Sequence, residues 1–83
     1  MEGERYVRVS DGEPVEVVRY DGNPDALRAW GGLAVTITGT PPGVFVGPVE
    51  VVVGDRVVRD GEGTLEVPRP YDFHSHYRRQ PVE

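Results

Sequence analysis

The stretch PVEVVRYDGNPDALRAWGG, residues 14–32, decides the fold class, because it contains a strand, a turn and a helix in immediate succession. Its first part, residues 14–20, is rich in valine, and β-branched residues favour strands. We expect this strand to lie near the middle of a sheet. The segment DGNP that follows, residues 21–24, has the glycine, asparagine and proline that are typical of turns.

The same stretch predicts a short helix whose two ends are both marked. Asn23 followed by Pro24 combines an N-cap residue with a proline at the first helical position. Leu27 and Trp30 are three residues apart and therefore lie on one face of the helix. A pair of glycines then ends it, as glycine commonly does at a helix C-terminus.

Further strands are predicted on both sides of this stretch by alternating or β-branched residues. The segments concerned are 5–10, 33–39, 49–53, 56–60 and 64–67. In the second of them, Leu33, Val35 and Ile37 share one face. Gly54 and Asp55 predict a tight connection between the two strands that they separate.

The segment TPPGVFVGP, residues 40–48, predicts a loop or an edge excursion, because proline cannot donate a hydrogen bond to a strand ladder. Near the C-terminus, the residues from Pro70 onward predict a short closing helix or an irregular closing segment. Phe73 and Tyr77 are four residues apart, so such a helix would turn both rings toward the sheet.

Together these elements predict an α+β fold in a single domain, residues 1–83. We expect a small antiparallel curled sheet or partial barrel of five to six strands, with one short helix and a short C-terminal helical segment that closes the fold. Both helices should place their apolar faces on one core. The residues expected in it are Leu27, Trp30, Val35, Ile37, Val57, Phe73 and Tyr77.

Composition narrows the classes of function. The chain has 83 residues, no cysteine and a net charge of −5, and all nine basic residues are arginine. The absence of cysteine excludes disulfides and thiolate metal sites, and the acidic balance argues against general DNA or RNA binding. No stretch is apolar enough for a membrane span, so we expect a soluble protein of the cytoplasm. A core this small favours a homo-oligomer.

The histidines His74 and His76 are the only candidates for a metal site, with Asp72 as the nearest third ligand. On a strand both imidazoles would lie on one face, as in some metal sites, whereas on a helix they would point away from each other. In either case two imidazoles are not enough for a site. The two serines, Ser10 and Ser75, stand in no nucleophile-elbow pattern. We therefore expect no catalytic residue, no metal and no cofactor.

Arginines interleaved with aromatic residues are the more informative pattern. They are Arg56, Arg59, Arg69, Arg78 and Arg79, together with Tyr71, Phe73 and Tyr77. Arginine forks bind phosphates and aromatic rings stack on bases, so the pattern suits a nucleotide-sized anion. For Phe73 and Tyr77 we prefer the interpretation as core residues, whereas the role of the arginines stays open.

The segment VGDRVVRDGEGTLEVPRPYDFHSHYRR, residues 53–79, resembles a widespread family of small phage and prophage proteins without an assigned function. Together with the opening strand, turn and helix, the resemblance covers about three-quarters of the chain. The positions that match the family's pattern are Gly54, Asp55, Arg59, Gly63, Pro70, Phe73 and Tyr77, and Arg69 replaces a lysine.

The departures from this pattern concern the histidines, one arginine, and the pair Tyr71 and Asp72, which replaces an acid and an aliphatic residue. His74 and His76 stand where the family tends to have glutamate and threonine, and Arg56 replaces a tryptophan. A family-wide metal or acid–base role of the histidines is therefore not implied. The expected arrangement is a closing element with Phe73 and Tyr77 inward, and with His74, Arg78 and Arg79 outward.

The resemblance implies a phage gene product in the host cytoplasm but no established activity. One hypothesis is a non-enzymatic binding protein that sequesters a small anionic ligand, such as a cyclic nucleotide immune signal, by analogy with anti-defence sponges. The ligand-binding residues expected for it are Arg59 and Arg69, with Tyr20 and Trp30 as stacking rings if they are not wholly buried. The other hypothesis is a protein-interaction module that inhibits or assists a host or phage protein.

Overall fold

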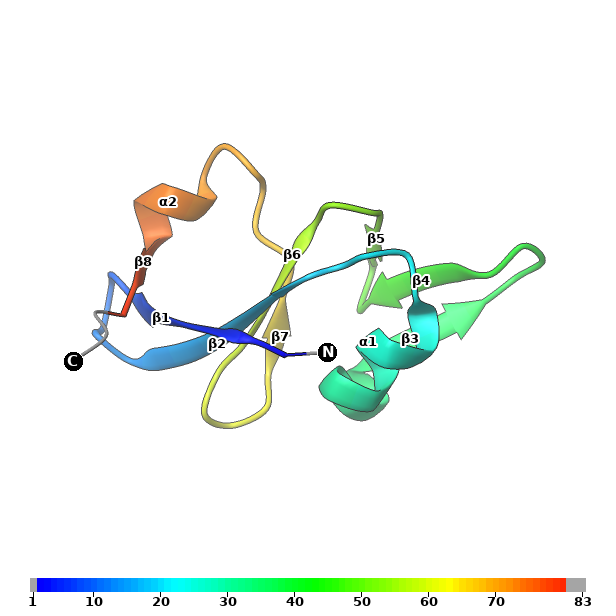
Figure 1. Ribbon diagram of the computed structural model, residues 1–83, viewed down its shortest axis with the longest axis horizontal. Helices are drawn as coiled ribbons and strands as arrows, with labels where there is room; N and C mark the ends of the chain where they lie inside the picture. The colour runs from blue at the N-terminus through cyan, green and yellow to red at the C-terminus, as the bar shows by residue number, and fades with distance from the viewer. Residues whose placement is uncertain (1, 81–83) are drawn as a thin grey trace.

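The computed structural model describes residues 2–80, which form two antiparallel sheets with one short helix and a small C-terminal helix (Figure 1). The five-stranded sheet has the order β7-β6-β2-β1-β8 and the three-stranded sheet the order β3-β4-β5. The first sheet contains β1 (Glu4–Arg8), β2 (Pro14–Arg19), β6 (Arg56–Arg59), β7 (Leu65–Glu66) and β8 (Tyr77–Arg79). The second contains β3 (Val35–Thr38), β4 (Gly43–Val46) and β5 (Val49–Val51). The helices are α1 (Pro24–Gly31), the 3₁₀ turn η1 (Gly32–Ala34) and α2 (Phe73–His76).

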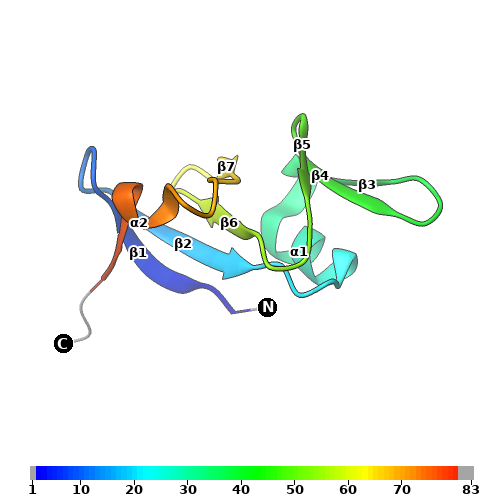
Figure 2. The ribbon, with the colours of Figure 1, turned by 90° about the horizontal axis from the view of Figure 1, so that it is seen from above.

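The α+β class is thus confirmed, as is the central position of the strand that begins at Pro14. The sheets are not closed into a barrel, and there are more strands than the five to six expected from the sequence. The described residues extend over 43 × 23 × 20 Å. The β3–β4 hairpin accounts for the length, because it projects away from the five-stranded sheet at the end opposite α2 (Figures 1 and 2).

Valines on β2 and β6 make the five-stranded sheet apolar on both faces. Val17 faces Val58 across the two strands and Val18 faces Val57, and all four are buried. Because neighbouring residues of a strand point to opposite faces, these two pairs belong to two different cores. A strand buried on both faces is expected to lack polar alternation, as the valine-rich sequence of β2 does.

The prediction of a single core was therefore wrong. The larger cluster joins α1, the second sheet and one face of the first sheet, and consists of Val18, Tyr20, Leu27, Val35, Val44, Val46, Val51, Val57 and Leu65, with Trp30 and Val67 packed against it. The smaller cluster lies on the opposite face under α2 and consists of Val15, Val17, Val58, Phe73 and Tyr77, with Tyr6 packed against it. Ile37 is in neither cluster.

Helix α1 forms as its sequence predicts. The Asn23 side chain accepts a hydrogen bond of 3.1 Å from the backbone N–H of Ala26, and proline follows at the first position. Leu27 is completely buried. The helix ends at Gly31, and the C-cap residue Gly32 has a φ of 75°, in the left-handed region that favours glycine.

Two expectations about the second sheet were wrong. Residues 43–46 form β4, the central strand of that sheet, rather than a loop or an edge. The strand can donate normally to both neighbours because Pro41, Pro42 and Pro48 all lie outside it. Leu33 belongs to η1 instead of a strand and is 90% exposed.

The connection at Gly54 and Asp55 is tight, but it does not join paired strands. β5 pairs with β4, whereas β6 pairs with β2, so the turn carries the chain from one sheet to the other. The backbone of Tyr20 at the end of β2 binds this turn on both sides, with Tyr20 N–H donating to Asp55 O and Gly54 N–H donating to Tyr20 O. These two bonds bring the start of β6 beside the end of β2.

For the closing segment, the sequence predicted correctly which residues are buried but did not predict the strand that follows the helix. Phe73 and Tyr77 are buried, and His74, Arg78 and Arg79 are exposed, as expected. The helix α2 covers only one turn, however, and the chain then continues as β8, which pairs with β1 at the edge of the sheet. None of the helices in residues 2–80 has the length and apolar character needed to cross a membrane.

Candidate anion site

Two arginines face each other across the centre of the five-stranded sheet. Arg19 at the end of β2 is the direct partner of Arg56 at the start of β6. Both point to the face that carries Val17 and Val58, since each lies two residues from one of these valines. Like charges directly opposite on neighbouring strands destabilise a sheet, so this pair is an arrangement that folding alone does not favour.

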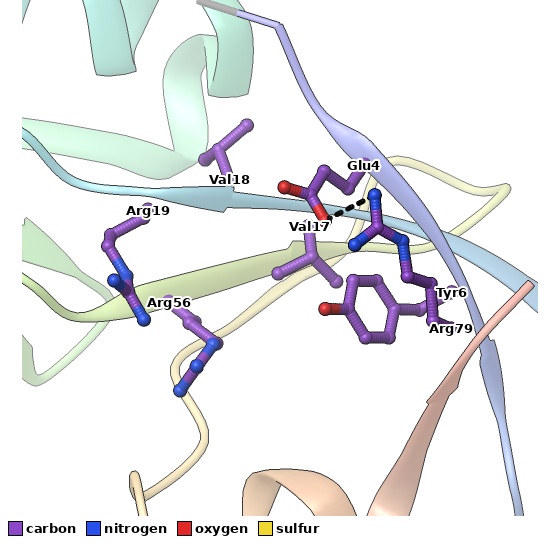
Figure 3. A pocket seen from close by; sticks show the side chains of 7 residues that line it. All are labelled: Glu4, Tyr6, Val17, Val18, Arg19, Arg56 and Arg79. Carbon is purple, nitrogen blue, oxygen red and sulfur yellow. Dashed lines mark ion pairs between the residues drawn. The ribbon is translucent and has the colours of Figure 1, made fainter.

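The pair borders a groove of about 320 Å³ next to α2 (Figure 3). Its lining consists of Glu4, Tyr6, Val17, Val18, Arg19, Arg56 and Arg79. Strand pairing brings Arg79 to the groove, because β8 places it opposite Tyr6 on β1. The groove is therefore assembled from four strands of one sheet.

The charges in this lining are not balanced. Three guanidinium groups face a single carboxylate, so the lining carries a net charge of +2. Glu4 forms its ion pair with Arg79, at 3.4 Å. Within residues 2–80, neither Arg19 nor Arg56 has a carboxylate oxygen within 4 Å. The unbalanced charge of the groove thus resides on the cross-strand pair.

The ring of Phe73 supports one member of this pair. The guanidinium carbon of Arg56 lies 4.6 Å from the centroid of the Phe73 ring, a distance at which a cation is attracted to an aromatic face. Phe73 is itself completely buried and makes an edge-to-face contact with Tyr6, with ring centroids 5.1 Å apart. The smaller core cluster therefore holds two side chains of the groove in place.

The residues that the sequence predicted for ligand binding lie elsewhere. Arg59 and Trp30 do meet, with the guanidinium carbon of Arg59 4.4 Å from the centroid of the Trp30 ring. Arg59 also donates to the Glu16 carboxylate and to the backbone carbonyl of Trp30, and the indole N–H donates to Glu16 as well. In this cluster the charge of Arg59 is matched by Glu16, and its contacts attach α1 to the sheet.

The other two predicted residues are separate from this cluster. Tyr20 is only 6% exposed and belongs to the larger core, so the condition for stacking on a ligand is not met. Its burial, with the nearby charge of Asp21, raises the pKa of its phenol. Arg69 is exposed and donates a hydrogen bond of 2.8 Å to the hydroxyl of Tyr71. Ligand binding by these residues stays a prediction.

A buried tyrosine also connects α2 and β8 to the other edge of the sheet. The hydroxyl of Tyr77 donates to the Glu66 carboxylate at 2.7 Å, which joins β8 to β7. Burial, followed by the bond and the charge of Glu66, raises the pKa of Tyr77 to about 12. The phenol is therefore neutral at physiological pH and acts as a hydrogen-bond donor.

The two histidines lie exposed on α2. In the described part of the chain, no group of three or more histidine, cysteine, aspartate or glutamate side chains is arranged to hold a metal ion. The absence of a metal requirement remains a prediction for experiment.

Sequence reasoning named Arg56 and Arg79 within its arginine–aromatic pattern but missed Arg19. The signal lies in the pairing of β2 with β6, since Arg19 is the last residue of one strand and Arg56 the first of the other. Comparison with models of known protein families, with curated proteins and with solved structures finds no match for the chain. The resemblance to a phage family thus stays an expectation from the sequence.

Proposed function

We propose that the protein is a non-enzymatic binding protein for a small phosphate-bearing anion, which it holds between Arg19 and Arg56 in the groove that Arg79 also lines. The observation that supports this proposal is the cross-strand arginine pair, which has no carboxylate partner in the described structure. An anion placed between the two guanidinium groups would neutralise both and remove their repulsion.

The chemistry of the groove suits such a ligand. Arginine presents a planar fork of donors that matches the oxygens of a phosphate, and these charge-assisted bonds are stronger than neutral ones. The Tyr6 hydroxyl and the Val17 side chain offer a polar and an apolar contact for the remainder of the ligand (Figure 3). A small cationic groove on an acidic protein also explains why a net charge of −5 does not exclude anion binding.

One biological form of this proposal follows the sequence resemblance. In that form, a phage protein in the host cytoplasm would sequester a cyclic nucleotide immune signal by binding it stoichiometrically. Association into a homo-oligomer would repeat the groove around a symmetry axis, so that several arginines could surround one ligand. The resemblance also favours Arg59 and Arg69 as ligand-binding residues. The variants Arg59→Gln and Arg69→Gln test this role separately from that of the groove.

A ligand screen tests the proposal. Binding of a small anion should raise the melting temperature according to RT ln(1 + [L]/Kd). We expect an increase with phosphate-bearing compounds for the wild type and a smaller increase in Arg19→Gln. The matched control is Arg28→Gln, which removes an exposed arginine on α1 outside the groove. If inorganic phosphate, nucleotides and cyclic nucleotides all leave the melting temperature and the calorimetric signal unchanged, the proposal is wrong.

One observation favours the alternative of a protein-interaction module. Four large apolar side chains of the second sheet and its flanking turns are exposed, and together they would supply apolar area for a protein contact. They are Leu33 at 90%, Val49 at 44%, Val52 at 54% and Val53 at 70%. If the protein binds no anion in the screen, the protein-interaction module becomes the better-supported function.

A further inference from the structure

We infer that the arginine groove selects a terminal phosphate monoester, such as that of a nucleoside monophosphate, over the phosphodiester of a cyclic nucleotide. This inference rests on the proposed function, because it concerns the ligand of the same groove. It also separates two forms of the proposal, since a cyclic nucleotide carries only diesters.

The charge that the groove can neutralise favours a phosphate monoester. Glu4 and Arg79 are already paired, so the two positive charges available to a ligand are those of Arg19 and Arg56. A phosphate monoester carries between 1.5 and 2 negative charges at pH 7, about the charge needed to balance both guanidinium groups. A phosphodiester carries one negative charge and leaves one arginine of the pair unbalanced.

The number of terminal phosphate oxygens also favours a monoester. A monoester has three terminal oxygens that accept hydrogen bonds, whereas a diester has two. Arg19 and Arg56 lie next to each other and present their guanidinium groups on the same side of the groove (Figure 3). Each guanidinium group can bind two oxygens of the same phosphate. With three terminal oxygens, both groups can bind in this way if they share one oxygen.

The charge of the groove differs between its two walls. The Glu4–Arg79 ion pair lies across the groove from the arginine pair, with the Tyr6 ring beside it (Figure 3). This second wall is neutral as a whole. A ligand with its charge concentrated at one end and an uncharged body at the other therefore fits better than one with its phosphate inside a ring.

The volume of the groove is also consistent with a nucleoside monophosphate. A volume of about 320 Å³ is at the lower end of the roughly 300–1,000 Å³ of small-molecule sites. One nucleotide unit is appropriate for such a volume. A cyclic dinucleotide, which contains two units, would extend beyond the groove of a single chain.

Calorimetry with four related compounds tests the inference on the full chain. The compounds are adenosine 5′-monophosphate, adenosine 3′,5′-cyclic monophosphate, adenosine and inorganic phosphate. We expect the monoester to bind about tenfold more tightly than the cyclic compound or better, because one charge-assisted hydrogen bond fewer is available to the diester. Inorganic phosphate as tight as the nucleotide would identify the phosphate group alone as the ligand, and weaker phosphate would show that the nucleoside contributes.

The outcomes distinguish this inference from the proposed function. Equal or tighter binding of the cyclic compound would overturn the inference and leave the anion site intact. No binding of any of the four compounds would overturn both.

Variants locate the selectivity. Arg19→Gln should bring the affinities for the monoester and the cyclic compound to within about threefold of each other, since the remaining arginine needs one charge only. Glu4→Gln should instead strengthen the binding of inorganic pyrophosphate, which is added to the calorimetry for this variant, because the substitution frees Arg79 for a second phosphate. The control Arg28→Gln should change neither the ratio of the monoester and cyclic-compound affinities nor the affinity for pyrophosphate. A selectivity that survives Arg19→Gln in a variant with an unchanged melting profile would contradict the assignment.

Discussion

Replacement of Phe73 by alanine tests the role of the smaller core cluster in both stability and binding. Phe73 is completely buried, and its ring contacts Tyr6 and Tyr77 at centroid distances of 5.1 Å and 5.3 Å. Truncation of a fully buried phenylalanine costs about 3–5 kcal/mol. At about 0.05–0.15 kcal/mol per residue, the entire stability of this chain is roughly 4–12 kcal/mol. Phe73→Ala should therefore remove a large part of the free energy of unfolding.

The single tryptophan provides the assay. Trp30 packs against the larger cluster, on the opposite side of the sheet from Phe73, so its fluorescence reports unfolding at a distance from the mutation. β2 and β6 contribute valines to both clusters, and for this reason the two should unfold together. With a urea m-value of about 1 kcal/mol/M, a loss of 3 kcal/mol shifts the midpoint by about 3 M.

Two further variants make the measurement decisive. Phe73→Leu should lose less stability and remain folded in water, which allows ligand binding to be measured with the support of Arg56 weakened. Ser75→Ala, on the exposed side of the same helix, is the control and should leave the midpoint unchanged. A loss below about 1 kcal/mol in Phe73→Ala would refute the reasoning, because it would mean that α2 contributes little to the fold.

Three other predictions concern titration, capping and metal. The pKa of Tyr77 is about 12 in the folded protein and 10.0 in the unfolded chain, so its contribution to stability is complete below pH 10 and is lost as the pH rises toward 12. The urea midpoint should therefore fall over this pH interval, and it should fall less in the variant Tyr77→Phe. Asn23→Ala should cost about 1 kcal/mol through the lost cap of α1, whereas Asn23→Asp should be nearly neutral; equal losses would exclude capping as the cause. Treatment with a chelator should leave the melting temperature unchanged. A decrease in melting temperature that zinc reverses would instead support a metal site at the histidines.

The sequence by itself determined the local elements. The cap at Asn23, the glycines that end α1 and the valine-rich pattern of β2 all act between neighbouring residues, and each appears in the structure as expected. The inward position of Phe73 and Tyr77 also followed from their spacing. These features depend on backbone propensity and on side-chain periodicity, which can be read from a single segment.

Only the tertiary structure decided which strands pair and which faces they bury. The turn at Gly54 looks like a hairpin in sequence, but the bonds from Tyr20 direct the next strand to β2 instead of back to β5. The same pairing divides the valines between two clusters and places Arg19 opposite Arg56. Strand register joins residues that are far apart in the chain, and it is set by the burial of both faces together rather than by any local preference. The arginine pair, and with it the groove, is for this reason a property of the folded sheet alone.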